Sequence, residues 1–216
     1  SISRKETPSY DSVLFEALHR ALDEEGDQKF IVLHLLGSHL LYSQRYPKEF
    51  TRFIPKSEEK KEKVIADYHN SLYFNDFVVD SILNILRNYS EKNQIPIAAV
   101  YTSDHGQNVY DDAPYAGHEY ADTVYNSIVE IPYIVWLSEQ YKTHFSERSN
   151  EIASNTGKSY MTDDHFHSLI DLLNINTPVL DKSRSLFNPD YFENHTRILI
   201  DGRIYDKKSK QIETSH

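Results

Sequence analysis

The sequence predicts an α/β domain with a central, mostly parallel sheet flanked by helices and a hairpin near the carboxyl end. Segments with helical spacing of apolar residues alternate with short apolar runs of strand length. Two of those runs end in polar turns, as strands of open α/β sheets do at their ligand-binding edge. The 216 residues, 39% of them hydrophobic, are enough for one sizeable core, so we expect a single domain over 1–216.

The first half of the chain contains two predicted helices and two predicted strands. Apolar residues recur at helical spacing over 11–25, and Gly26 is a typical stop signal. The continuous apolar run 30–36 is typical of a strand buried on both faces of a parallel sheet. Residues 58–89 fit one long amphipathic helix or two helices. A strand is then expected over 95–102, so the order begins helix, strand, helix, strand.

The second half adds a strand, a helix and a hairpin. The apolar run 131–137 predicts the third strand, whereas 139–159 shows no clear period. A helix is expected over 162–173, because its threonine and two aspartates are residues that favour a helix start. The segment 197–206 alternates around an Asp-Gly dipeptide typical of hairpin turns.

The composition excludes several classes of function. The 33 acidic and 23 basic residues leave a formal net charge of −10, which argues against nucleic-acid binding, because phosphate contacts require a basic surface. With no cysteine, a disulfide scaffold, a cysteine zinc site and a thiol nucleophile are excluded. No stretch approaches the roughly 18 consecutive apolar residues of a membrane span.

Polar side chains follow two of the predicted strands where those strands end. His39 comes directly after the run 30–36, and Asp104 and His105 come directly after the strand 95–102. His118 lies in the following loop, near enough along the chain to fold over the same edge. Each histidine lies within two residues of a glycine, which lets the backbone turn sharply and leaves room for a substrate. The sequence therefore predicts that these four residues meet at one rim of the sheet.

Imidazoles and a carboxylate are usual ligands of zinc or manganese, and a catalytic site needs about three of them plus an open position. Two interpretations remain open, because Asp-His-Gly is also a frequent turn with an Asx hydrogen bond. The segment "DDHFHS" offers a second candidate, since His165 and His167 could bind a metal. Asp163 and Asp164 beside them are better explained as capping and dipole partners of a helix.

Several motifs in one order carry a family resemblance. They are "VLHLLGSH", "RYPKEF", "DYHNSLYFNDFVVDSIL", "YTSDHG", a downstream "GH", "IPYIVWLSEQY" and "DDHFHSLIDLLNI". Together they resemble the catalytic domain of the phosphoethanolamine transferases, a sulfatase-like branch of the alkaline phosphatase superfamily. The resemblance runs from about residue 10 to 205, and the combination is far more specific than any single motif.

The resemblance implies a site and a reaction. Asp104 and His105 would ligate a catalytic zinc, with manganese as the alternative metal, and His39 and His118 would bind the transferred phosphoryl group or a second zinc. A threonine would attack phosphatidylethanolamine and then pass phosphoethanolamine to a phosphate of lipid A or of a sugar. Such enzymes work at the periplasmic face of the bacterial inner membrane, so the partners implied are the lipid donor and an anionic glycolipid acceptor.

The departures from the family pattern also lead to expectations. The nucleophilic threonine, a further acidic ligand and the membrane helices of relatives have no counterpart here, so the chain resembles a carboxyl-terminal portion that is inactive by itself. Gln107 stands where relatives commonly have glutamate, which bears on acceptor recognition or amine contact. The alternatives are a sulfatase-like hydrolase or phosphoglycerol transferase of the same superfamily, and a non-catalytic lobe that lacks the nucleophile.

Overall fold

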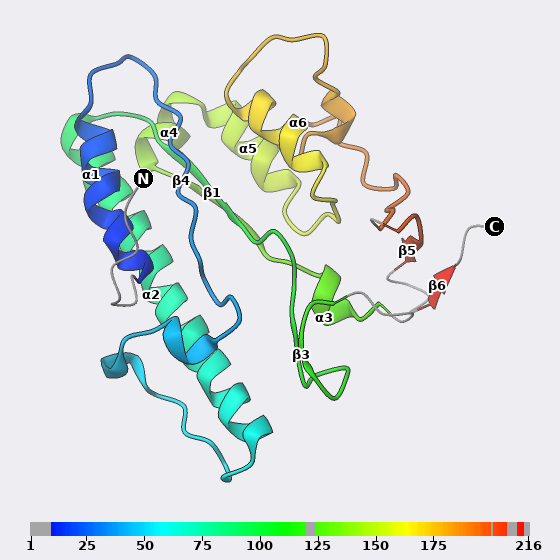
Figure 1. Ribbon diagram of the computed structural model, residues 1–216. Coiled ribbons are helices and arrows are strands. Elements are labelled where there is room, and N and C mark those ends of the chain that lie inside the picture. The colour runs from blue at the N-terminus through cyan, green and yellow to red at the C-terminus, as the bar shows by residue number, and fades with distance from the viewer. Residues whose placement is uncertain (1–9, 120–123, 200, 207–210, 214–216) are drawn as a thin grey trace. The chain divides into compact units, whose positions relative to one another are not determined.

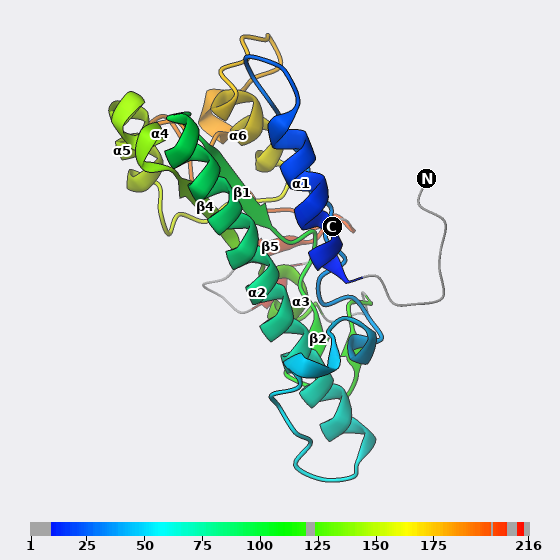
Figure 2. The same ribbon diagram turned by 90° about the vertical axis from the view of Figure 1, so that its left-hand side faces the viewer.

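The computed structural model in Figures 1 and 2 describes residues 10–119, 124–199, 201–206 and 211–213. The chain divides into two compact units, 1–138 and 139–216, which are taken separately below. The expectation of one domain over 1–216 stays a prediction. None of the helices in the described ranges is both long enough and apolar enough to cross a membrane.

The first unit begins with the helix that the apolar spacing predicts. A short 3-10 turn, η1 (Asp11–Val13), leads into α1 (Leu14–Asp23). Leu18 and Leu22 lie one turn apart on the same face, where both are buried against helix α2 (Lys60–Asn93). The helix expected over 11–25 is therefore confirmed.

Helix α2 is one continuous helix of 34 residues, about 50 Å long. Its buried positions recur at helical spacing, and they are Ala66, Asn70, Ser71, Phe74, Val78, Leu86 and Ser90. The helix ends where Gln94 adopts a left-handed conformation with φ 55° and the Ser90 hydroxyl donates to the Ile95 carbonyl at 2.6 Å. Of the two possibilities for 58–89, one long helix is observed. Two 3-10 turns, η2 (Tyr42–Gln44) and η3 (Lys48–Phe50), pack against it.

Strand β1 (Ala98–Thr102) pairs with β4 (Tyr133–Leu137), and Figure 1 shows the two running side by side. The pair is antiparallel, with Val100 opposite Val135. Both strands were predicted, but the expected parallel pairing is not found among the described strands, all of whose ladders are antiparallel. The physical reason lies in the connection: parallel neighbours need a crossover, usually a helix, and among the described residues between β1 and β4 the one helix is the four-residue α3 (Asn126–Val129).

The predicted strand 30–36 runs extended but joins no sheet in the described residues. Its side chains alternate, as a strand's do. Ile31, Leu33 and Leu35 pack on the core formed by α1 and α2, whereas Phe30 and Val32 remain 59% and 72% exposed. Burial on both faces was expected, and only one face is buried.

The described part of the second unit contains three α-helices and a hairpin. The helices are α4 (Glu139–His144), α5 (Ser146–Ser154) and α6 (Asp164–Leu172), with a 3-10 turn η4 (Lys182–Arg184). Helix α6 was predicted, whereas α4 and α5 were not, because two short, mostly polar helices separated at Phe145 leave no sustained apolar period. A hairpin turn forms at the predicted place, because Leu199 N donates to Arg203 O at 2.8 Å and Gly202 has φ 84°. The expected type I′ turn at Asp201-Gly202 is not formed, since Asp201 does not adopt a positive φ. Beyond the prediction, β5 (Ile204–Asp206) pairs with β6 (Gln211–Glu213).

Asn70 of α2 holds the segment that precedes this helix through side-chain hydrogen bonds to its backbone. Its Oδ1 accepts hydrogen bonds from Arg52 N at 2.8 Å and Phe53 N at 2.7 Å, and its Nδ2 donates to Phe53 O at 2.9 Å. The side chain is only 1% exposed, so water cannot replace these bonds without a structural opening.

We predict that Asn70→Ala lowers the free energy of unfolding by about 2–4 kcal/mol, because it leaves three backbone groups without their partner. Urea denaturation measures the change. Asn84→Ala is the matched control on the same helix, since Asn84 bonds only to the exposed side chains of Asp80 and Arg87. Equal losses in the two variants would contradict the prediction.

Asp171 is the buried carboxylate at the centre of the second unit's polar core. It accepts hydrogen bonds from the Ser185 hydroxyl at 2.6 Å and the Asn188 amide at 3.2 Å, and it pairs with Arg148 at 2.8 Å. Burial by itself would raise the pKa of this carboxyl, but the hydrogen bonds and the guanidinium outweigh it and lower the pKa below its ordinary value.

The lowered pKa of Asp171 predicts a contribution to acid stability. The unfolded chain takes up the proton at a higher pH than the folded chain, so the stabilisation is present above the ordinary carboxyl pKa and is lost as the pH falls through the folded value. The difference in unfolding free energy between the parent and Asp171→Asn should therefore shrink on acidification. The exposed Asp190→Asn serves as control, and a pH-independent difference for Asp171→Asn would contradict this account.

Candidate metal centre

The Asp104–His105 turn directly follows strand β1. Asp104 Oδ1 accepts a hydrogen bond from His105 N at 3.0 Å, and the Ser103 hydroxyl donates to His105 O at 2.8 Å. The expected turn is therefore present, closed by a side-chain bond to the backbone. The Asp104 side chain nevertheless remains 86% exposed. A carboxylate held in place but open to solvent can still accept a cation.

The tautomer of His105 follows from its neighbour. Nδ1 lies 2.8 Å from the carbonyl oxygen of Gly106, and only a protonated Nδ1 can donate to that oxygen. In the neutral ring with this tautomer, Nε2 carries the lone pair, and it lies 3.8 Å from Asp104 Oδ1. Two tetrahedral zinc ligands with metal bonds of about 2.0–2.1 Å lie roughly 3.4 Å apart, so a small adjustment lets both atoms share one metal. A hydrogen bond from the ring nitrogen that does not face the metal, here Nδ1, is the usual way in which proteins orient a metal-binding histidine.

Gly106 makes this turn possible through close packing. Its N–H donates to the Ile128 carbonyl at 2.8 Å. A Cβ at this position would lie 2.3 Å from the Ser127 carbonyl oxygen and 2.9 Å from the Ile128 carbonyl group. No side chain fits there, so the glycine ties the turn directly to α3.

His118 reaches the same edge through a small hairpin. Strands β2 (Asn108–Val109) and β3 (Ala116–Gly117) pair, and His118 follows at once. Its ring stacks on that of His105 with centroids 4.0 Å apart. Burial lowers the pKa of His118, and the neighbouring His105 and His39 lower it further, so the ring is neutral at neutral pH. Its Nδ1 is buried with no hydrogen-bond partner in the described structure, as expected of an atom that awaits a ligand.

Asn108 shapes this hairpin, and the sequence did not single it out. The side chain is fully buried, and its Oδ1 accepts from Asp112 N at 2.9 Å and Ala113 N at 3.2 Å. Its Nδ2 donates to the carbonyls of Ala113 and Tyr115. Asparagine is common in loops of every kind, so its residue type alone could not reveal this role.

His39 is positioned by a turn at Gly37, which has φ 54°. The carboxylate of Asp11 accepts from Leu36 N at 3.0 Å and Gly37 N at 2.8 Å, which anchors the turn to the start of α1. His39 lies close enough to His118 to influence its pKa, so the structure brings three of the predicted histidines to one place, with Asp104 beside them. Asp11 was missed because 25 residues separate it from the turn.

The Gln107 side chain makes a structural contact with η2. Its Nε2 donates to the Tyr42 hydroxyl. Burial raises the pKa of Tyr42 to about 12, so the phenol stays protonated. Gln107 thus links η2 to the loop that follows the Asp104–His105 turn, which we call the metal turn. The link continues to α2, because the rings of Tyr42 and Tyr68 are 5.0 Å apart.

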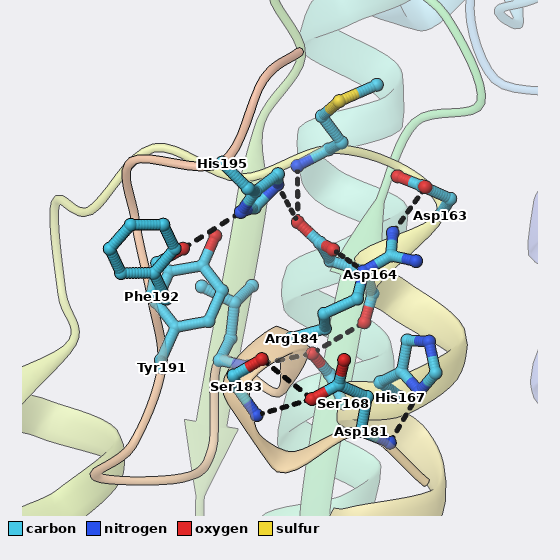
Figure 3. A network of polar contacts seen from close by, with 12 residues as sticks. Asp163, Asp164, His167, Ser168, Asp181, Ser183, Arg184, Tyr191, Phe192 and His195 are labelled. Atoms are coloured by element: carbon cyan, nitrogen blue, oxygen red, sulfur yellow. Dashed lines mark hydrogen bonds and ion pairs between the residues drawn. The ribbon is translucent and has the colours of Figure 1, made fainter. Parts of the chain in front are cut away.

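The second candidate, the "DDHFHS" segment, is occupied by structural contacts (Figure 3). Asp164 is fully buried and pairs with Arg184 at 2.8 Å and His195 at 2.9 Å. The expected side-chain cap at Asp163 is not formed, because Asp163 pairs with Arg184 instead. His167 Nδ1 accepts from Asp181 N at 3.2 Å.

The described residues contain no group of three or more histidine, aspartate or glutamate side chains arranged to hold a metal ion. Asp104 and His105 therefore form a pair of converging ligands rather than a complete site. This edge carries a carboxylate and an imidazole, with the neutral ring of His118 and the ring of His39 beside them, and these are donor types that zinc accepts.

Fold and site together define an α/β protein in which an aspartate and histidines meet beyond the end of strand β1. The family model described as "Sulfatase" matches residues 2–175, and the chain belongs to the sulfatase family. The expected alkaline phosphatase/sulfatase-like fold class is confirmed by this match and by structural neighbours.

Relatives make the resemblance more specific. Phosphoethanolamine transferase EptA of Escherichia coli K12 is 31% identical over 177 residues, which are 78% of this chain and 32% of that protein. Kdo(2)-lipid A phosphoethanolamine 7''-transferase of the same strain is 29% identical over 140 residues, 62% of this chain and 24% of the relative. This chain therefore spans a third or less of the length of these relatives.

A solved structure shares both fold and sequence with this chain. The C-terminal periplasmic domain of EcEptC from Escherichia coli, in complex with Zn, superposes with a TM-score of 0.77 at 25% identity. The match covers 91% of this chain and 55% of that one. The predicted similarity to phosphoethanolamine transferases is confirmed.

We predict that Gly106→Ala disrupts the metal turn, because the added Cβ cannot coexist with the Ser127 carbonyl 2.3 Å away. The free energy of unfolding should fall by about 2–4 kcal/mol, and zinc affinity should fall with it. Calorimetric unfolding and zinc titration measure the two effects.

Gly157→Ala is the control for the prediction at Gly106. A Cβ at Gly157 meets nothing within 4 Å, although its φ of 85° carries a cost of about 1 kcal/mol. If Gly106→Ala costs no more than Gly157→Ala, the close approach at Gly106 is not a constraint.

Proposed function

We propose that this chain forms part of a zinc-dependent transferase that moves phosphoethanolamine from phosphatidylethanolamine to a phosphate of lipid A or of a sugar. The observation that carries the proposal is the convergence of Asp104 Oδ1 and the free Nε2 of His105 beside the stacked ring of His118. The similarity to transferases of that name supports it, as does the zinc complex of a structural neighbour. The neighbour's periplasmic origin supports a location at the periplasmic face of the inner membrane.

Asp104 and His105 would hold the metal. Zinc bound there would lower the pKa of a nucleophilic hydroxyl and offset negative charge on the phosphate. The exposed carboxylate and the oriented imidazole suit zinc, and manganese is the alternative metal for the same donors. Two ligands make a weak site, so we place the remaining ligands and the nucleophilic threonine outside residues 1–216.

His118 and His39 would hold the phosphoryl group. The neutral His118 ring can offer one N–H to a phosphate oxygen, and its buried, unpartnered Nδ1 supports such a role. The threonine oxygen attacks the phosphorus of the donor, diacylglycerol leaves, and phosphoethanolamine stays on the threonine. An oxygen of the acceptor phosphate then attacks the same phosphorus and releases the threonine.

Two other functions share parts of this arrangement. A sulfatase-like hydrolase or a phosphoglycerol transferase would use the same Asp-His pair with water or another donor. A non-catalytic lobe is favoured by one observation, that no complete group of metal ligands is found in the described residues. The three hypotheses differ in metal affinity and in what is released when the acceptor is withheld.

We predict that the 216-residue chain binds zinc weakly and transfers nothing, whereas a longer protein that includes the upstream catalytic half binds zinc tightly and transfers phosphoethanolamine. In that protein Asp104→Ala and His105→Ala should each lower transfer at least about a hundredfold. The measurements are calorimetric zinc titration and the release of diacylglycerol from a labelled donor.

Asp27→Ala removes an exposed carboxylate elsewhere and serves as control. Unchanged transfer and zinc affinity in Asp104→Ala would contradict the metal-binding role of Asp104, and absence of both zinc binding and transfer in the longer protein would favour the non-catalytic lobe. Rapid release of free phosphoethanolamine without acceptor would identify a hydrolase instead.

A further inference from the structure

The segment between η3 and α2 exposes large apolar side chains. Ile54 is 80% exposed, more than any other large hydrophobic side chain in the described residues, and Phe53 beside it is 41% exposed. The segment is the cyan loop ahead of α2 in Figures 1 and 2. Exposed apolar side chains that gather at one place commonly mark an interaction surface.

The exposure of these side chains is built into the fold. Asn70 fixes the backbone of Arg52 and Phe53 through three hydrogen bonds of 2.7–2.9 Å. The Phe53 ring packs edge-on against His69 with centroids 5.3 Å apart. The segment therefore has a defined conformation that directs Ile54 outward.

The apolar surface continues along α2. The guanidinium of Arg52 lies 5.1 Å from the centroid of the Tyr73 ring, and Phe50 contacts Tyr73 and Phe77 at 5.8 and 4.9 Å. Tyr73 and Phe77 are four residues apart on one helix face and are about 40% exposed. We call Phe53, Ile54, Tyr73 and Phe77 the apolar patch.

Basic residues surround this patch in an otherwise acidic chain. Residues 45–63 contain seven lysines and arginines and four glutamates, whereas the whole chain carries a net charge of −10. Arg52 and Lys56 flank Phe53 and Ile54 directly. Apolar side chains at the centre and basic ones at the rim are the combination with which peripheral proteins bind anionic bilayers.

The patch and the loop that follows Asp104 and His105 contact different faces of α2. Lys61 Nζ lies 5.4 Å from the Tyr110 ring, and Tyr68 packs on Tyr42, which accepts from Gln107. At about 100° per residue, Tyr73 and Phe77 lie roughly 140° and 180° around the helix from Tyr68, so the patch remains open on the side of α2 away from that loop.

We propose that the apolar patch, with Arg52 and Lys56, docks on the surface of an anionic lipid bilayer. Phe53 and Ile54 enter the interface between headgroups and acyl chains, and the two basic side chains contact lipid phosphates. The inference goes beyond the proposed function, because docking needs neither metal, nucleophile nor acceptor.

Vesicle co-sedimentation of the 216-residue chain without metal tests the proposal. Binding is expected to vesicles of phosphatidylethanolamine and phosphatidylglycerol, and it should weaken with added salt because the charges are exposed. Phe53→Ser with Ile54→Ser should lower the partition coefficient about tenfold or more, and Arg52→Gln with Lys56→Gln should remove most of the salt dependence. Ile95→Ser is the control, an exposed apolar residue just beyond the other end of α2.

A second measurement uses the absence of native cysteine. A polarity-sensitive fluorophore on Ile54→Cys should shift to the blue on vesicles and be quenched from within the bilayer, whereas the same label on Ile95→Cys should not. Circular dichroism confirms that each variant is folded. Absence of vesicle binding by the folded chain, including the case in which the patch binds a protein instead, would overturn the proposal, as would equal responses of the two labels. Docking of this chain, with no transfer by the longer protein that includes the upstream half, would leave this proposal standing while the proposed function fails.

Discussion

The packing of helix α2 against α1 and strand β1 is the constraint on which the rest of the first unit depends. Val78 has no exposed surface, and Leu86 joins Leu18 and Leu22 in the core. A helix of 34 residues that is packed at these points is rigid, so the positions of its polar side chains along the helix axis are fixed. Asn75 donates to the Tyr101 hydroxyl on β1 at 2.9 Å, one residue before the strand ends ahead of the metal turn. Helix α2 thus supports both the strand that delivers the candidate ligands and the segment that carries the apolar patch.

The candidate metal centre is shaped mainly by backbone contacts. Gly106 approaches Ile128 so closely that no side chain fits, and the fully buried Asn108 closes the hairpin that delivers His118. Because these restraints satisfy backbone groups, the side chains of Asp104 and His118 stay available for a ligand. This explains how an exposed carboxylate and a ring nitrogen without a hydrogen-bond partner persist in a folded unit.

Two aspartates show how burial and ion pairing determine whether a carboxylate is structural or open to a ligand. Asp164 is fully buried and pairs with Arg184 and His195, so its carboxylate is committed to holding the start of α6 (Figure 3). Asp104 is 86% exposed and pairs only loosely with His105 at 3.8 Å. Both belong to Asp-His sequences of similar appearance. Burying a charge is costly unless it is fully paired, so the buried aspartate is structural and the exposed one can bind a cation.

The sequence by itself determined the features that local patterns encode: the helices at 11–25 and 58–89, the strands that became β1 and β4, the turn at Asp104 and His105, and membership of the sulfatase family. Apolar spacing and contiguous motifs suffice for these, because each arises within a few turns of chain. Tertiary structure alone decided that β1 and β4 pair antiparallel, that the strand predicted at 30–36 joins no described sheet, and that Asp11 anchors the turn before His39. Those outcomes depend on groups 25 or more residues apart, and the free energy of such contacts comes from packing that no local pattern specifies.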